Sequence, residues 1–551
     1  MKISLKSRIV SVLAVAALAG TVVVGAPTAA NAAPQCATAS FVTQCAGAGA
    51  DGAPYLMIAA ANFNGTVFIY SHGLRPDLEI PASLGVPLGF GGALPVTYAA
   101  EPGPLATTDL SVINKLVAAG YGVAGSGFSR QGINATEALA ANKELIATFK
   151  TQFPTTKSVV AWGSSLGGLH SQMLAEKHPE LVDGVILACP AANPSGAIID
   201  YFGDALWGFK ALFDPSIMVG GYSKDPATRA GQQLLNVQKI LVVLNSLSAN
   251  VGNTDAKTSW PATASPAGLA LQAAGIPSRS AVVLVGLMAG VPTRSAHIDG
   301  TSAPSAATAE SYPLAGAPAL AVLENMGTTL NYGTFLNADG ELLAGGKIFD
   351  NTKTDYAARV AAEADIYSFA LSGNSAVAAI LGALAATPRE TADPAAVAKI
   401  SSIFGLTGKI TKPTVIFQSE TDSFVPSSIV QWYADSYAEQ YAAEKKKAMT
   451  DAKKSRNYVA PTNNLVTLWL KTAAKYSKFT ALGTPDTTAK GGAGTGHCDF
   501  TAAQWLAAAD LMTARLADGK FPNGGKITTT ARKAGLSYDK DFRVPLFKKL
   551  Q

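Results

Sequence analysis

The chain has 551 residues, of which 48% are hydrophobic and 15% charged, and its formal net charge is +5. A chain this long and this apolar can bury a substantial core, and its length indicates a core domain with a large insertion or a second domain. The nearly balanced charge excludes the strongly basic class of nucleic-acid-binding proteins, so no nucleic-acid partner is expected.

The amino terminus has the pattern of a secretory signal peptide. Three basic residues precede an apolar run at 9–25, and Ala30-Asn31-Ala32 offers a small-residue cleavage site. The alternative is a membrane anchor, but the run is shorter than the roughly 18 to 20 residues of a membrane span. We therefore expect residues 1–32 to be removed and the mature protein to be secreted, extracellular and without stable membrane insertion. Loss of the three basic residues lowers the formal charge from +5 to +2.

Four cysteines are too few to build a disulfide scaffold. Cys36 and Cys45 lie close together in sequence and could form a bridge near the mature amino terminus. Cys189 and Cys498 are distant, yet each adjoins an element that carries candidate site residues. For this second pair a disulfide and two buried thiols are both open.

Residues 33–190 predict the first part of an α/β core. From Gly65 onward, β-rich runs alternate with helical patterns, which is typical of a mostly parallel sheet with helices on both faces. The predicted strands are 67–70, 122–125, 157–162 and 185–188, and the predicted helices are 110–119, 136–153 and 168–178. A tight turn at 163–167 joins a strand directly to a helix.

Residues 191–410 change in character. Helical patterns at 197–213, 231–247, 281–290 and 355–386 predict a large, mainly helical lid inserted into the core. A β-hairpin is expected around Asn337-Ala338-Asp339-Gly340. The alternation of strands and helices that is typical of the core returns in residues 411–551, with predicted strands at 414–417 and 465–470. A long helix from Ser427 ends in a charged stretch at 444–456, expected to be a solvated face, and a closing helix is predicted at 501–517.

Ser165 is the candidate nucleophile. It is the central residue of Gly163-Ser164-Ser165-Leu166-Gly167, a Gly-x-Ser-x-Gly pattern between a predicted strand and a predicted helix. Small flanking residues permit a strained corner that exposes the serine hydroxyl above the sheet. The amino terminus of the helix adds partial positive charge, which favours a developing oxyanion.

A serine hydroxyl needs a general base, and the chain has five histidines. His72 lies in a His-Gly pattern typical of an oxyanion loop, and His170 lies about 140° around the helix from the nucleophile. His178 ends that helix, and His297 belongs to the predicted lid, where it could contact substrate. His497 follows the last strand in a glycine-rich loop that could place an imidazole over the serine. The alternative for His497 is a surface histidine.

The acid that orients the base is expected at a strand end between the serine and the histidine in chain order. Asp422 is the first candidate and Glu420 the reserve, since both follow the strand at 414–417. Asp499 is too close to His497 in sequence to reach its outer nitrogen. The alternative for Asp422 is a turn or capping carboxylate.

These motifs together resemble the α/β-hydrolase superfamily. They are Ser71-His72-Gly73, the Gly163 to Gly168 turn, the Asp422 to Pro426 segment and Gly496-His497-Cys498, in the order of the family and at its strand ends. The resemblance covers 65–190 and 412–517. It implies an oxyanion hole formed by the backbone N–H groups of Leu166 and Leu74.

The chain also departs from the family pattern. Ser419 stands where the family often has glycine, and the lid is unusually long. A cysteine beside the base histidine is similar to the arrangement in tannase-like and feruloyl esterases, which join it to a cysteine beside the nucleophile. In this chain that neighbour is Ser164.

The resemblance and the candidate triad predict a secreted serine hydrolase that cleaves carboxylic esters through an acyl-enzyme, with no metal and no cofactor. The apolar helices of the lid favour a small or polymeric ester with an apolar portion. Two alternatives use the same scaffold. One is a secreted peptidase of the prolyl-oligopeptidase or aminopeptidase type, and the other is a non-catalytic binding protein.

Overall fold

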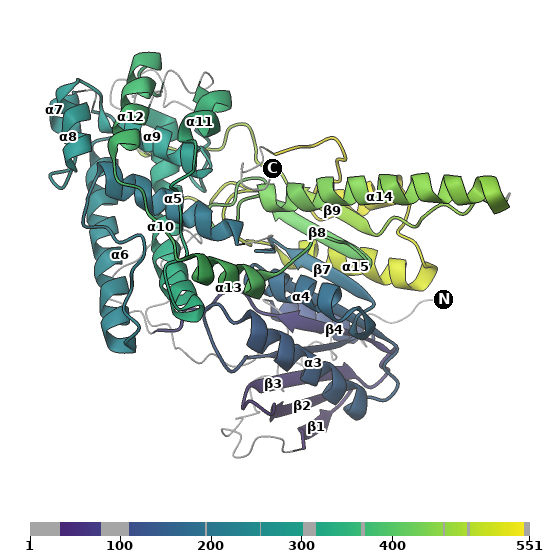
Figure 1. Ribbon diagram of the computed structural model, residues 1–551. Helices are drawn as coiled ribbons and strands as arrows, with labels where there is room; N and C mark the ends of the chain where they lie inside the picture. Colours follow the sequence, from purple (N-terminus) through teal and green to yellow (C-terminus); the bar gives the residue numbers. More distant parts are fainter. Residues whose placement is uncertain are drawn as a thin grey trace.

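A computed structural model describes residues 33–78, 109–192, 196–253, 255–300, 316–364, 370–455, 458–481 and 485–544 (Figure 1). The predicted signal peptide, residues 1–32, lies outside this part of the chain. None of the described helices combines the length and apolarity needed to cross a membrane.

The described residues form one large sheet with the strand order β1-β2-β3-β5-β4-β6-β7-β8-β9. The strands are β1 (Gln35–Ala39), β2 (Val42–Ala48), β3 (Pro54–Ala60), β4 (Thr66–Ser71), β5 (Gly122–Ser126), β6 (Ser158–Ser164), β7 (Gly184–Ala188), β8 (Thr414–Ser419) and β9 (Leu465–Leu470). Strands β4 to β9 are parallel to one another, and β1, β2 and β3 add an antiparallel edge that pairs with β5. The predicted mostly parallel sheet is confirmed, but the antiparallel edge was not predicted.

Helices cover both faces of the sheet. Successive side chains of a strand point to opposite sides, so a strand with apolar side chains on both sides is buried from both. In β4, Val67 and Ile69 pack in the core that includes α3 (Ala135–Gln152), α4 (Leu166–Lys177) and α14 (Ser428–Ser455). Phe68 and Tyr70 pack with α2 (Leu110–Ala118), α15 (Ala502–Asp518) and α16 (Gly524–Lys533) on the other face. The carboxyl ends of the parallel strands are therefore held between two layers of helices.

Between β7 and β8 the described residues form helices and no strand. These helices are α5 (Ala197–Leu212), α6 (Pro226–Ala249), α7 (Ala256–Ser259), α8 (Pro266–Ala273), α9 (Ser278–Ala289), α10 (Ala317–Ala344), α11 (Tyr356–Ala364), α12 (Asn374–Ala386) and α13 (Pro394–Phe404). We call this set the helical insertion, and it lies beside the sheet (Figure 1). The helical pattern at 355–386 contains two helices, α11 and α12, with Ser372 and Gly373 at positive φ just before α12.

The predicted hairpin at 337–340 is wrong, because these residues belong to α10. Asn and Asp favour turns when their side chains bond the local backbone. In α10 they bond other elements instead. Asn337 donates to the carbonyl oxygen of Val219 at 3.0 Å, and Asp339 forms an ion pair with Arg130. Tertiary partners thus override the local turn preference.

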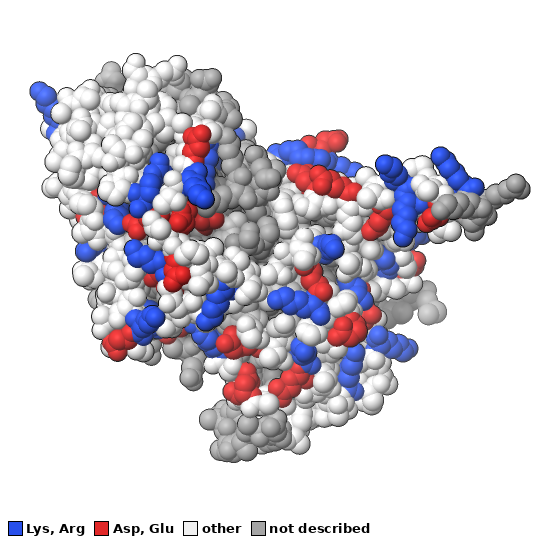
Figure 2. Space-filling model, in the orientation of Figure 1, with Lys and Arg blue, Asp and Glu red and all other residues white. Residues whose placement is uncertain are grey.

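Charged side chains are interspersed on the face of the described chain shown in Figure 2, where Lys and Arg lie among Asp and Glu. The charged stretch that begins at Glu444 falls on the end of α14, which projects away from the sheet (Figure 1). Its described side chains are mostly exposed, which agrees with a solvated face.

Candidate active site

Ser165 occupies a strained turn between β6 and α4. Its φ of +56° and ψ of −123° lie in a region that residues with a side chain rarely adopt. The flanking Gly163 and Gly167 allow the turn to press against the end of β4, since a Cβ on either would overlap the carbonyl oxygen of Ser71. The glycines are therefore required by close backbone approach.

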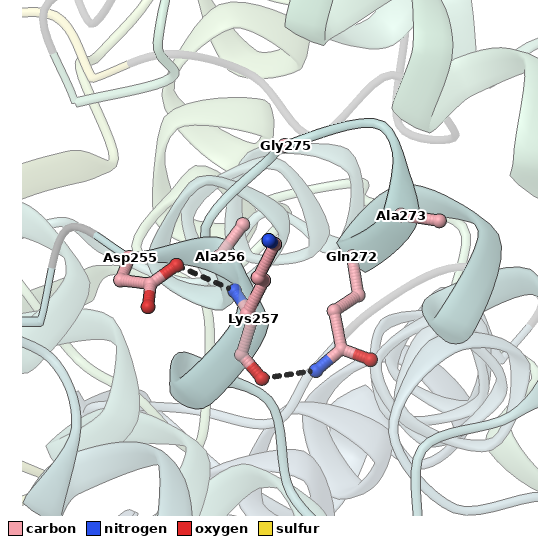
Figure 3. Close-up of a pocket in the computed structure, with 6 residues that line it drawn as sticks. All are labelled: Asp255, Ala256, Lys257, Gln272, Ala273 and Gly275. Atoms are coloured by element: carbon pink, nitrogen blue, oxygen red, sulfur yellow. Dashed lines mark hydrogen bonds between the residues drawn. The ribbon is translucent and has the colours of Figure 1, made fainter.

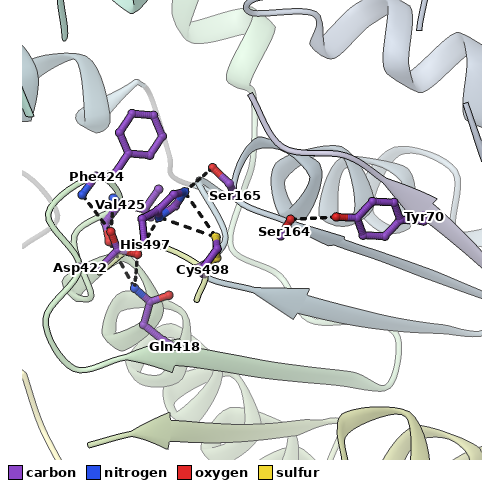
Figure 4. Close-up of a disulfide and its surroundings, with 10 residues drawn as sticks. Tyr70, Ser164, Ser165, Gln418, Asp422, Phe424, Val425, His497 and Cys498 are labelled. Atoms are coloured by element: carbon purple, nitrogen blue, oxygen red, sulfur yellow. Dashed lines mark hydrogen bonds and ion pairs between the residues drawn. A yellow bond between two sulfur atoms is a disulfide. The ribbon is translucent and has the colours of Figure 1, made fainter. Parts of the chain in front are cut away.

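The structure brings Ser165, His497 and Asp422 together (Figure 4). The Nε2 atom of His497 lies 2.7 Å from the Oγ atom of Ser165, and Nδ1 lies 2.8 Å from Oδ2 of Asp422. All three are buried, with exposed fractions of 4%, 5% and 0% for the serine, histidine and aspartate. When Nδ1–H donates to the carboxylate, Nε2 is free to accept the serine proton.

The carboxylate of Asp422 is held by further donors. Its Oδ1 atom accepts the backbone N–H groups of Phe424 and Val425, both at 2.9 Å. Gln418, near the end of β8, donates to Oδ2 at 3.3 Å. Hydrogen bonds to a charged acceptor are stronger than neutral ones. Sequence reasoning missed Gln418, although its position four residues before the acid was a usable signal.

The reserve acid is used elsewhere. Glu420 accepts the backbone N–H of Thr472 at 2.7 Å and its hydroxyl at 2.8 Å, and it lies 4.0 Å from Arg294. Asp499 is exposed. The geometry therefore favours Asp422 as the partner of His497.

Two buried histidines near the nucleophile are poor bases. Burial, aided by the positive charge of Arg75, lowers the pKa of His72 to about 4. Burial, aided by His72, lowers the pKa of His170 to about 3. The nitrogens of His72 lie 2.8 Å from the carbonyl oxygen of Gly73 and 3.3 Å from that of Gly127. His72 thus fixes the backbone of its own loop.

The other two histidines contact carboxylate side chains away from Ser165. His178 lies 3.4 Å from Glu180. His297 lies 2.7 Å from Glu324 and 3.1 Å from the carbonyl oxygen of Ala489, and the hydrogen bond to Glu324 raises its pKa. His297 therefore joins the helical insertion to the chain that leads to His497.

The two predicted oxyanion donors belong to Leu166, which follows Ser165, and to Leu74, which follows Gly73. A Cβ on Gly73 would lie 3.3 Å from the Cβ of Ser165, so the backbone that leads to Leu74 passes close to the serine. Leu166 is the first residue of α4, and the N–H groups at a helix amino terminus have no partner within the helix. Their role as oxyanion donors stays a prediction.

Two disulfides are present in the structure, Cys36–Cys45 and Cys189–Cys498. The second joins the residue after β7 to the residue after His497 (Figure 4). Together with His497 its sulfur atoms form a close group, but they are bonded to each other and cannot act as thiolate ligands of a metal ion.

The residue before the nucleophile takes no part in this disulfide. The hydroxyl of Ser164 lies 3.0 Å from that of Tyr70, and burial raises the pKa of Tyr70 to about 12. In tannase-like and feruloyl esterases the cysteine beside the histidine is bonded to a cysteine beside the serine. The chain therefore differs from them in the partner of this disulfide, which is Cys189.

A pocket of about 430 Å³ lies between α7 and α8 (Figure 3). The backbone N–H of Lys257 donates to the Asp255 carboxylate, which caps α7, at 2.9 Å, and Gln272 of α8 donates to the carbonyl oxygen of Lys257 at 2.8 Å. Both helices belong to the outer part of the helical insertion (Figure 1), away from the strand ends that carry the candidate triad.

A mostly parallel sheet with a serine on the sharp turn between a central strand and its helix defines the α/β-hydrolase class. The chain has the α/β-hydrolase fold, as its motifs predicted. Residues 131–281 match the model of an esterase family, described as "Esterase: Putative esterase". No curated protein matches the chain in sequence.

Several solved structures are similar to the chain. Feruloyl esterase B from Aspergillus oryzae is 13% identical with a TM-score of 0.32, and the match covers 73% of this chain and 71% of that one. Tannin acyl hydrolase from Aspergillus niger is 12% identical with a TM-score of 0.28, covering 79% and 76%. The rice cell wall degrading esterase LipA from Xanthomonas oryzae is 11% identical with a TM-score of 0.28, covering 79% and 84%. At these scores the similarities carry no inference about substrate.

Proposed function

We propose that the protein is a secreted serine hydrolase that cleaves carboxylic esters through an acyl-enzyme. The observation that carries the proposal is the unbroken hydrogen-bonded line from Asp422 through His497 to Ser165, with distances of 2.8 Å and 2.7 Å. The match of residues 131–281 to an esterase family supports the same class of reaction.

Ser165, His497 and Asp422 have distinct roles in the proposed reaction. Ser165 attacks the ester carbonyl while His497 takes its proton at Nε2 and later gives it to the leaving alcohol. Asp422 holds the imidazole in the tautomer with the proton on Nδ1 and stabilises the imidazolium that forms. Water, activated by the same histidine, then releases the acyl group.

Negative charge on the carbonyl oxygen needs donors that are already in place. The backbone N–H groups of Leu166 and Leu74 are the proposed donors, because Leu166 follows Ser165 and Leu74 follows Gly73, which packs against Ser165. Preorganised donors of this kind contribute strongly in a site from which water is excluded.

Export is part of the proposal. It rests on the signal-peptide pattern at 1–32 and on the two disulfides, since disulfides persist in oxidising compartments. The substrate is proposed to be an ester with an apolar portion, in keeping with the apolar composition of the helical insertion.

The test compares wild type with Ser165→Ala and the neighbouring control Ser164→Ala on p-nitrophenyl esters and aminoacyl amides. Ser165→Ala should lower kcat by about 10⁴- to 10⁶-fold, and Ser164→Ala should retain activity, because Ser164 bonds Tyr70 and not the imidazole. Hydrolysis of amides without esters would establish a peptidase. Labelling of Ser165 by a fluorophosphonate would exclude a non-catalytic binding protein.

A further inference from the structure

The carbonyl group of Ser423 meets two hydroxyl groups that come from the helical insertion. The hydroxyl of Tyr201, on α5, donates to this oxygen at 2.9 Å, and the hydroxyl of Thr329, on α10, donates at 2.8 Å. The two hydroxyl oxygens are 3.2 Å apart. Both side chains are fully buried, so water does not compete for these bonds.

The same peptide group also contacts the carboxylate of the proposed triad. The Ser423 carbonyl and the Phe424 N–H belong to one planar peptide unit, whose oxygen and hydrogen point in opposite directions. The oxygen accepts the two hydroxyls, and the N–H donates to Oδ1 of Asp422 at 2.9 Å. Rotation of this peptide is therefore restrained at both ends.

The hydroxyls are present as donors at any working pH. Burial, and to a smaller extent the charge of Asp422, raise the pKa of Tyr201, so its proton is retained. Thr329 has one proton and three acceptors within reach, the Ser423 oxygen at 2.8 Å, the Asn325 carbonyl oxygen at 3.1 Å and the Tyr201 hydroxyl oxygen at 3.2 Å. The shortest distance favours the bond to Ser423.

We propose that Tyr201 and Thr329 are positioning residues that align the carboxylate of Asp422 by fixing the Ser423–Phe424 peptide. In this scheme their hydroxyls act through the Ser423 carbonyl and not on the reacting atoms. Without the hydroxyls the peptide can rotate, its N–H leaves Oδ1, and the carboxylate loses one of its two backbone donors. The inference rests on the proposed function and makes the helical insertion part of the catalytic geometry.

A purely structural role would predict a different result, and the chain offers a matched control. Tyr222, between α5 and α6, and Thr334 are buried and are joined through Asn236, which donates to their hydroxyls at 3.1 Å and 3.0 Å. Thr334 lies on α10 like Thr329. Removal of these hydroxyls should destabilise the fold without changing the turn at Asp422.

The experiment measures the single variants Tyr201→Phe and Thr329→Val and the double variant that combines them. The control set is Tyr222→Phe, Thr334→Val and the double variant of that pair. All replacements keep the shape and remove one hydroxyl. Each single change at Tyr201 or Thr329 should lower kcat by about fivefold and the double by about 10- to 30-fold, from the usual contribution of one buried hydrogen bond. KM should stay within twofold, and the control double should keep kcat within about twofold. Thermal unfolding of all variants identifies any that fail to fold. If a double variant does not fold, the kcat values of the single variants test the inference.

Two further measurements separate alignment from stability. The acidic limb of the kcat/KM profile should move to lower pH in the Tyr201 and Thr329 variants, because a misplaced carboxylate stabilises the imidazolium less. Thr329→Ser, which keeps the hydroxyl, should restore most of kcat. The inference is overturned if the double variant stays within twofold of wild type, if the control pair loses as much activity, or if Thr329→Ser is as slow as Thr329→Val.

The outcome also distinguishes this inference from the proposed function. An active wild type, an inactive Ser165→Ala and an unimpaired Tyr201→Phe/Thr329→Val double variant would remove only the positioning role. A wild type whose activity does not depend on Ser165 would remove the proposed function and the positioning role together.

Discussion

Replacing Asp422 by asparagine tests the role of the carboxylate without changing its shape. Two backbone N–H groups, from Phe424 and Val425, point at Oδ1. The amide of asparagine will place its oxygen there, because its NH₂ group cannot accept those bonds. The NH₂ group then faces Nδ1 of His497, which must become an acceptor. The imidazole proton moves to Nε2 and points at Ser165.

The wrong tautomer cannot take the serine proton, so the expected loss is large. A change of this kind lowers kcat by about 10⁴-fold, which corresponds to about 5 kcal/mol of transition-state stabilisation. Fold and stability should change little, since the bonds to the two backbone donors are retained.

The assay is kcat/KM on a p-nitrophenyl ester, with Glu420→Gln as the matched control. Glu420 also follows β8, but it bonds Thr472 rather than His497. We expect Glu420→Gln to stay within about threefold of wild type, because its contacts involve no reacting group. A loss of less than about tenfold in Asp422→Asn, or an equal loss in Glu420→Gln, would refute this assignment of the acid.

Two other predictions concern stability. The pKa values of His72 and His170 in the folded state, about 4 and about 3, lie below the ordinary 6.5, so the unfolded chain takes up protons first. The free energy of unfolding should therefore fall as the pH drops from 6.5 toward 4, by about 1.4 kcal/mol per pH unit for each histidine. His170→Leu should reduce this slope in urea titrations at pH 7 to 5, and an unchanged slope would contradict the burial argument. Gly167→Ala should abolish the folded, active state, because its Cβ would overlap the Ser71 carbonyl. The control is Gly382→Ala in α12, where the new Cβ atom has nothing within 4 Å, and it should raise the free energy of unfolding by about 0.5 to 1 kcal/mol. A stable, active Gly167→Ala protein would show that the close approach of the turn to Ser71 does not require glycine.

The sequence predicted the parts of the fold that depend on local patterns. The strand, turn and helix around Ser165 could be located because glycine spacing and hydrophobic runs act over a few residues. The proximity of Asp422 and His497 to Ser165 could be predicted because strand ends of a parallel sheet meet at one edge, and their roles as acid and base stay a proposal. The antiparallel strands before Gly65 were missed, since β1, β2 and β3 contain several alanines, a residue that is depleted in strands.

The contacts that refine the site could not be predicted from sequence. Tyr201 and Thr329 are separated from Ser423 by 222 and 94 positions, and no local pattern marks either as a donor to that carbonyl. Cys189 and Cys498 were recognised only as a possible pair, because pairing depends on distances between Cα atoms that the fold alone fixes. Long-range polar contacts of this kind follow from packing, not from periodicity.

The Cys189–Cys498 bond closes a covalent ring that contains the helical insertion and the Asp422 turn, with a sequence separation of 309 between its ends. A protease that cuts once within this ring leaves two fragments that stay attached to each other until a reductant is added. Nicked protein would thus migrate as an intact chain on a non-reducing gel. A broken backbone in the ring therefore need not separate Ser165 from His497.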